Sequence, residues 1–66
     1  MDLATFEWLL TDDGQHLLEA ATHAYVDHAG DPVRSAAAVR KIEPDPDRSA
    51  AALTQVGLRA RGVAKL

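Results

Sequence analysis

The chain contains no cysteine, so neither a disulfide nor a thiolate metal site can hold it together. Aromatic residues are scarce, with one phenylalanine, one tryptophan and one tyrosine. No apolar run approaches the roughly 20 residues that a membrane-spanning helix requires. The first ten residues carry acidic charge where a secretory signal would carry basic charge. These absences predict a cytoplasmic protein that has no membrane contact.

The length of 66 residues allows one domain at most. A chain of this size buries only about 60% of the surface that its unfolded form exposes, so we expect marginal stability and no deep, enclosed active site. Helix packing or a partner must supply the stability that small scaffolds otherwise obtain from disulfides or metal.

The net charge of −3 is distributed unevenly along the sequence. Residues 1–47 hold all ten acidic residues and three basic ones, whereas the stretch from Arg48 onward holds four basic residues and no acidic one. Such asymmetry can mark a tail that meets phosphates or an acidic partner. We favour attraction between the two halves within one fold, because four charges are few for a nucleic-acid binder.

The apolar pattern predicts an all-α fold. Alanine is the commonest residue, β-branched residues are sparse, and apolar positions recur three or four residues apart. We expect a small bundle of three to four helices joined by short turns, which forms a single helical module over residues 1–66. The predicted helices span residues about 2–10, 12–29, 32–42 and 47–65.

Capping residues mark the predicted helix starts. Asp2 and Thr11 can cap the first two helices, and Gly30 is expected to stop the second in a left-handed conformation. The segment DPVRSAAAV at 31–39 is echoed by DPDRSAAAL at 45–53. Both have the capping residue followed by proline that opens a helix, so we interpret the repeat as two similar helix starts.

The last predicted helix contains two glycines, Gly57 and Gly62, and each costs about 1 kcal/mol relative to alanine. We therefore expect this helix to fray at its end. The sequence stops at Leu66 without a capping glycine, a proline or a polar tail. This ending predicts the N-terminal part of a longer protein, or a chain end that lies against another molecule.

Two groups of side chains are candidates for contact with other molecules. Phe6 and Trp8 are predicted to be core or docking anchors, and the apolar residues of the last helix share one face. The predicted docking face comprises Phe6, Trp8, Leu53, Val56 and Val63. The predicted basic border comprises Arg59, Arg61 and Lys65, which largely point elsewhere.

A histidine and carboxylate series lies on one face of the second predicted helix, at Asp12, His16, Glu19, His23 and Asp27. Such residues can hold zinc. We favour a solvated helix face and predict no metal ion, because His16 and His23 lie two turns, roughly 10 Å, apart and cannot both reach one ion. The sequence also contains no recognisable nucleophile motif and no glycine-rich phosphate loop, so we expect no catalysis by this chain alone.

A helix-turn-helix reader of DNA is the next alternative, since the last two predicted helices are joined by a short turn and the last carries arginines. The charges argue against it. Glu43, Asp45 and Asp47 would lie near the DNA phosphates at the start of the recognition helix, and the arginines lie at its other end.

Three stretches together resemble the N-terminal region of bacterial class I S-adenosylmethionine-dependent methyltransferases that carry a THUMP-like domain. They are DLATFEWLLTDDGQHLLEAA, GDPVRSAAAVRK and AALTQVGLRARGVAKL. The resemblance rests on their combination and order, with Phe6–Thr11 and Ala52–Gln55 the most telling segments. The chain departs from the family pattern at Gly57, Gly62 and Leu66.

The resemblance implies a parent protein in which a Rossmann-like methyltransferase domain follows and binds S-adenosylmethionine. This sequence ends before that domain, so we assign no cofactor and no catalytic residue to it. The implied role is a non-catalytic accessory or scaffold whose apolar faces dock on the methyltransferase domain. Its basic last helix would border the substrate groove, with RNA as the substrate by analogy with other THUMP-bearing enzymes.

The alternative function is that of a free-standing small helical interaction protein. Such a chain would cover its exposed apolar stripes by self-association or by binding a protein partner.

Overall fold

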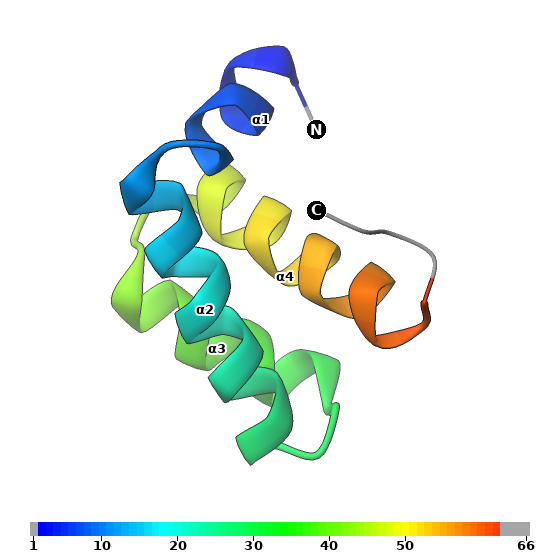
Figure 1. Ribbon diagram of the computed structural model, residues 1–66. Helices are drawn as coiled ribbons and strands as arrows, with labels where there is room; N and C mark the ends of the chain where they lie inside the picture. Colours follow the sequence, from blue (N-terminus) through cyan, green and yellow to red (C-terminus); the bar gives the residue numbers. More distant parts are fainter. Residues whose placement is uncertain (1, 63–66) are drawn as a thin grey trace.

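The computed structural model describes residues 2–62, which fold into four α-helices (Figure 1). The helices are α1 (Leu3–Leu9), α2 (Asp12–Asp27), α3 (Pro32–Ile42) and α4 (Pro46–Ala60). Short turns join them, and no strand occurs within residues 2–62. The predicted all-α class and the small bundle are confirmed.

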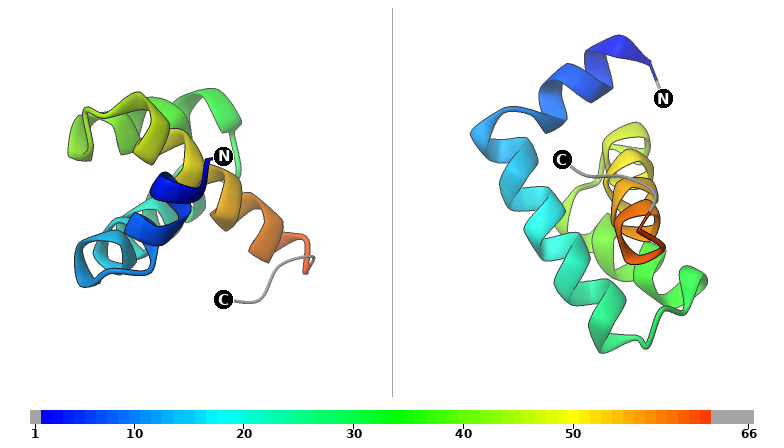
Figure 2. Two further views of the ribbon diagram at one scale, coloured as in Figure 1. Left: turned by 90° about the horizontal axis from the view of Figure 1, so that it is seen from above. Right: turned by 45° about the vertical axis from the view of Figure 1, so that its right-hand side comes forward.

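The helices α2 and α4 form the centre of the arrangement. Each of them packs against the three other helices, whereas α1 and α3 do not contact one another. In the views of Figures 1 and 2, α1 lies at one end of the bundle and the turn between α2 and α3 lies at the other. Of the described helices, α2 and α4 alone therefore support α1.

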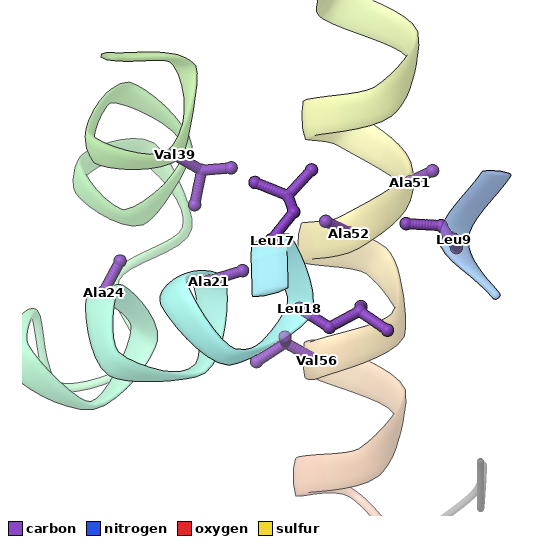
Figure 3. Close-up of a cluster of buried hydrophobic side chains, with 9 residues drawn as sticks. All are labelled: Leu9, Leu17, Leu18, Ala21, Ala24, Val39, Ala51, Ala52 and Val56. Carbon is purple, nitrogen blue, oxygen red and sulfur yellow. The ribbon is translucent and has the colours of Figure 1, made fainter. Parts of the chain in front are cut away.

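Within residues 2–62, the core consists of nine buried apolar side chains, four of them alanines (Figure 3). They are Leu9, Leu17, Leu18, Ala21, Ala24, Val39, Ala51, Ala52 and Val56. Alanine permits close helix approach but buries little apolar area, and stabilisation scales with that area at about 25 cal/mol per Å². The few leucines therefore supply much of the stability of this module.

All four helices begin at the predicted capping residues. Each of Asp2, Thr11, Asp31 and Asp45 accepts hydrogen bonds through its side chain from amides of the first helical turn. At Asp2 the donor is the Thr5 amide, at 2.8 Å. This hydrogen bond favours the charged carboxylate and lowers the pKa of Asp2 below its ordinary value.

The repeat has a packing role beyond the two caps. The serine in each copy is buried, with Ser35 at 0% and Ser49 at 3% exposure. The Ser49 hydroxyl donates to the carbonyl of Pro46 at 3.3 Å, but the Ser35 hydroxyl has no hydrogen-bond partner within residues 2–62. Both copies therefore place their serine in the interior, and among the described residues the hydroxyl is hydrogen-bonded in the second copy alone.

The α2 helix ends at Asp27, two residues before the predicted end at 29. Gly30 adopts the predicted left-handed conformation with φ 77°, but Ala29 already has φ 53°. A positive φ is uncommon for residues other than glycine. The sequence pattern therefore predicted the glycine that stops the helix, but it did not predict that the backbone leaves the helical conformation already at Ala29.

The α4 helix ends at Ala60, so the predicted end at 65 is wrong. Gly62 was expected inside the helix as a weakening residue. It has φ 71° instead and donates its amide to the carbonyl of Arg59 at 2.9 Å, as a glycine just past a helix end does. The predictions for Val63, Lys65 and Leu66 lie outside the described residues.

Gly57 does lie inside α4, as predicted, and its replacement by alanine is expected to stabilise the chain. An added Cβ would meet only the Arg61 guanidinium, at 3.8 Å, which is ordinary van der Waals contact. The substitution removes the helix penalty of glycine, so Gly57→Ala should raise the free energy of unfolding by about 0.5–1 kcal/mol. Urea denaturation followed by circular dichroism checks this, and a lower midpoint would contradict it.

Candidate docking surfaces

The tryptophan of α1 lies half-buried against α4. The guanidinium of Arg48 stacks over its ring, 4.2 Å from the ring centroid. The same guanidinium lies 3.6 Å from the carboxylate of Glu43, so one arginine connects α1 to the segment between α3 and α4. The ion pair is partly exposed and contributes little stability on its own, but stacking and charge together restrict the positions of both side chains.

A depression of about 370 Å³ opens beside this pair, and we call it the Trp8 depression. It is lined by Trp8, Asp13, His16, Leu17, Ile42, Glu43 and Arg48. Ile42 is 57% exposed at its edge, so a large aliphatic side chain here meets solvent. Tryptophan and arginine beside an exposed aliphatic residue match the composition of anchors in protein interfaces.

A second apolar surface runs along α1, and we call it the α1 stripe. It consists of Leu3, Phe6 and Leu10, which are 72%, 37% and 57% exposed. Spacings of three and four residues place them on one side of the helix. Leu9, which is 1% exposed, instead points into the core (Figure 3).

A third surface is the concavity between α3 and α4, which we call the α3–α4 groove. Two depressions of about 570 and 250 Å³ adjoin here, since both are lined by Ala36, Ala50 and Leu53, and we treat them together as the groove. Its larger part is mostly apolar and reaches Tyr25 and the turn at Gly30. Among residues 2–62, its charged lining residues are Arg40 in one part and Arg61 in the other.

The predicted docking face is divided among these surfaces. Phe6 lies in the α1 stripe, Trp8 in the Trp8 depression, and half-buried Leu53 in the α3–α4 groove. Val56 is only 3% exposed and belongs to the core, so its placement on a docking face is wrong. The physical reason is the rotation of α4, which turns Val56 toward α2 and leaves Leu53 at the margin of the core.

The two described residues of the predicted basic border open onto different surfaces. Arg59 lines a depression of about 350 Å³ against α2, and its Nε is buried without a hydrogen-bond partner in the described part of the chain. Arg61 donates from Nε to the carbonyl of Gly57 at 3.3 Å and lines the α3–α4 groove. Residues 59 and 61 therefore do not form one basic strip.

The polar face of α2 meets Arg59, a neighbour that the sequence pattern did not predict. His16, Glu19 and His23 are exposed and line the same depression as Arg59. The depression places Arg59 beside Glu19, but no ion pair joins these two described residues, so attraction between the two halves stays a prediction. Across residues 2–62, no three histidine or carboxylate side chains converge in a way that could hold a metal ion. No helix in that range combines the length and apolarity needed to cross a membrane.

Residues 2–62 match the model of the family described as "Domain of unknown function (DUF8688)", and the chain belongs to this family. No curated protein and no solved structure matches the chain significantly. The family description assigns no activity, so the relation to methyltransferases stays a prediction from the resemblance.

Proposed function

We propose that this chain is a non-catalytic docking module of an S-adenosylmethionine-dependent methyltransferase-like protein. The Trp8 depression supports the docking part of this proposal. The three resembling stretches support the methyltransferase part. S-adenosylmethionine and the catalytic residues would then belong to the larger domain, with none of them on this module.

The Trp8 depression has the properties of a preformed binding site. Contact with the core on one side and with Arg48 on the other holds the indole in one position, so binding costs little further side-chain entropy. An apolar side chain of the methyltransferase domain would cover Ile42 and the open face of the depression. The nearby charges of Asp13 and Arg48 would form the polar rim that such contacts usually have.

RNA remains the substrate class that the resemblance implies. Because Arg59 and Arg61 open onto different surfaces, the docking proposal does not depend on a basic border. A role for Arg59, Arg61 and Lys65 beside a substrate groove is a separate proposal. Glutamate substitutions at these positions should weaken RNA binding by the full-length protein and reduce its salt dependence.

The docking proposal is tested on the protein produced from its native gene. Its intact mass shows whether a methyltransferase-sized region follows this module, and a mass near 7.1 kDa would refute that part. In a longer protein, Ile42→Asp should remove hydrogen-exchange protection around the Trp8 depression, because an aspartate would place an uncompensated charge in an apolar contact.

Val33→Asp is the matched control for this substitution. Val33 is also an exposed aliphatic residue of α3, at 77%, but it does not line the depression. We expect Val33→Asp to leave the protection unchanged. Equal protection in the native protein and in the Ile42 variant would contradict docking at this site.

A further inference from the structure

The α1 stripe and the α3–α4 groove have complementary shapes. The stripe is a ridge of large apolar side chains, and the groove has a floor of small residues that includes Ala36, Ala50 and Gly57. An amphipathic helix that lays its apolar side into such a groove is a common mode of recognition. Within one molecule the stripe cannot enter the groove, because Leu9 holds α1 against the core with its other side.

The two surfaces are also complementary in charge. Among residues 2–62, the groove itself is lined by two arginines and no acidic residue, although the chain as a whole is acidic. Asp2 and Asp47 line the adjoining depression between α1 and α4. The segment that carries the stripe has a net negative charge, because the first arginine or lysine of the sequence is Arg34. Glu7 lies next to the stripe on α1, and Asp12 and Asp13 follow it. A second copy of this chain therefore offers the charge that the groove lacks.

The stripe-bearing helix borders the groove. A depression between α1 and α4 is lined by Asp2 and Thr5 on one side and by Asp47, Ala50, Ala51 and Thr54 on the other. Ala50 and Thr54 also line the groove. Two neighbouring surfaces that complement each other can form a dimer about a two-fold axis. The stripe of each copy then lies in the groove of the other copy.

We propose that two copies of this chain pair by placing the α1 stripe of each in the α3–α4 groove of the other. A specific interface requires about 1,200 Å² of total buried surface, and the two identical contacts would share it equally. Roughly 600 Å² per copy would be needed, out of an accessible surface of 4393 Å². The Trp8 depression shares no lining residue with the stripe or the groove, so the proposed pairing contact does not use it.

Sedimentation equilibrium of the 66-residue chain, from about 10 μM to about 1 mM, tests this pairing. We expect the mass to approach twice 7.1 kDa as the concentration rises. Leu3→Asp should raise the dissociation constant at least about tenfold, because it places a charge in the apolar contact. Val26→Asp is the matched control, since Val26 is equally exposed, at 70%, and lies on α2 outside both surfaces.

A charge exchange tests whether the groove is the receiving surface. Arg61→Glu should weaken the pair, and Glu7→Lys in the same chain should restore at least part of the lost affinity.

A chain that stays monomeric up to about 1 mM overturns the proposal. So does a dimer that Leu3→Asp weakens but Arg61→Glu does not, because the stripes would then meet each other. Neither result bears on docking at the Trp8 depression, which the Ile42 variant tests independently.

Discussion

Replacement of Gly14 by alanine is expected to remove about 3 kcal/mol of the free energy of unfolding, a large part of the stability of so short a chain. Gly14 is buried in the first turn of α2, where the end of α1 crosses directly over it. An added Cβ would lie 2.6 Å from the carbonyl carbon of Leu9 and closer still to the Leu9 Cα and the Trp8 carbonyl oxygen. These are backbone atoms, so no side-chain rotation can relieve the overlap.

The α1 helix would have to move away from α2 to make room for the methyl group. That movement pulls on the cap in which the Gly14 amide donates to Thr11, and on the 2.8 Å hydrogen bond from the Gln15 side chain to the Leu9 carbonyl. Overpacking of this kind costs about 3 kcal/mol at the upper end of its usual range. At 0.05–0.15 kcal/mol per residue, a chain of this length has a total stability of only about 3–10 kcal/mol.

Urea denaturation followed by fluorescence and circular dichroism checks the prediction for Gly14. The fluorescence reports on α1 directly, because Trp8 is the only tryptophan. Gly57→Ala is the matched control, since it makes the same chemical change inside another helix and is expected to act in the opposite direction. A Gly14 variant with an unchanged denaturation midpoint would show that α1 does not cross α2 as described.

The contrast between these two glycines shows which parts of the fold could be predicted. Helix starts depend on a side chain and amides within three residues, so Asp2, Thr11, Asp31 and Asp45 indicated them directly. The close approach at Gly14 depends on how two helices cross. Nothing in the neighbouring residues distinguishes this glycine from a weak helix former.

The candidate surfaces were predictable to the same limited extent. The spacing of apolar residues identified Phe6, Trp8 and Leu53 as candidates, because it depends only on helix geometry. It could not separate them into three surfaces or assign Val56 to the core, since that depends on the rotation of α4 against α2. The stacking of Arg48 on Trp8 joins residues forty positions apart, and local sequence carries no signal for it.

Leu9→Ala is expected to release α1 from the bundle. Leu9 is 1% exposed and is the only buried residue that α1 contributes to the core, where it lies beside Ala51 and Ala52 of α4 (Figure 3). Neighbours this small cannot fill the cavity that its truncation leaves. The loss should therefore fall within the range of about 2–5 kcal/mol that such truncations cost.

The released segment would not remain helical, because seven residues are too few to form a stable helix alone in water. We expect rapid hydrogen exchange in α1, red-shifted Trp8 emission and a lower denaturation midpoint. Leu10→Ala is the matched control, since the adjacent leucine is 57% exposed and its truncation should change the free energy of unfolding by less than about 0.5 kcal/mol. Equal midpoints for the two variants would refute the anchoring role of Leu9.

Release of α1 would also remove both the α1 stripe and Trp8 from their places. The Leu9 variant should therefore lose pairing and docking together, whereas Leu3→Asp should lose pairing alone.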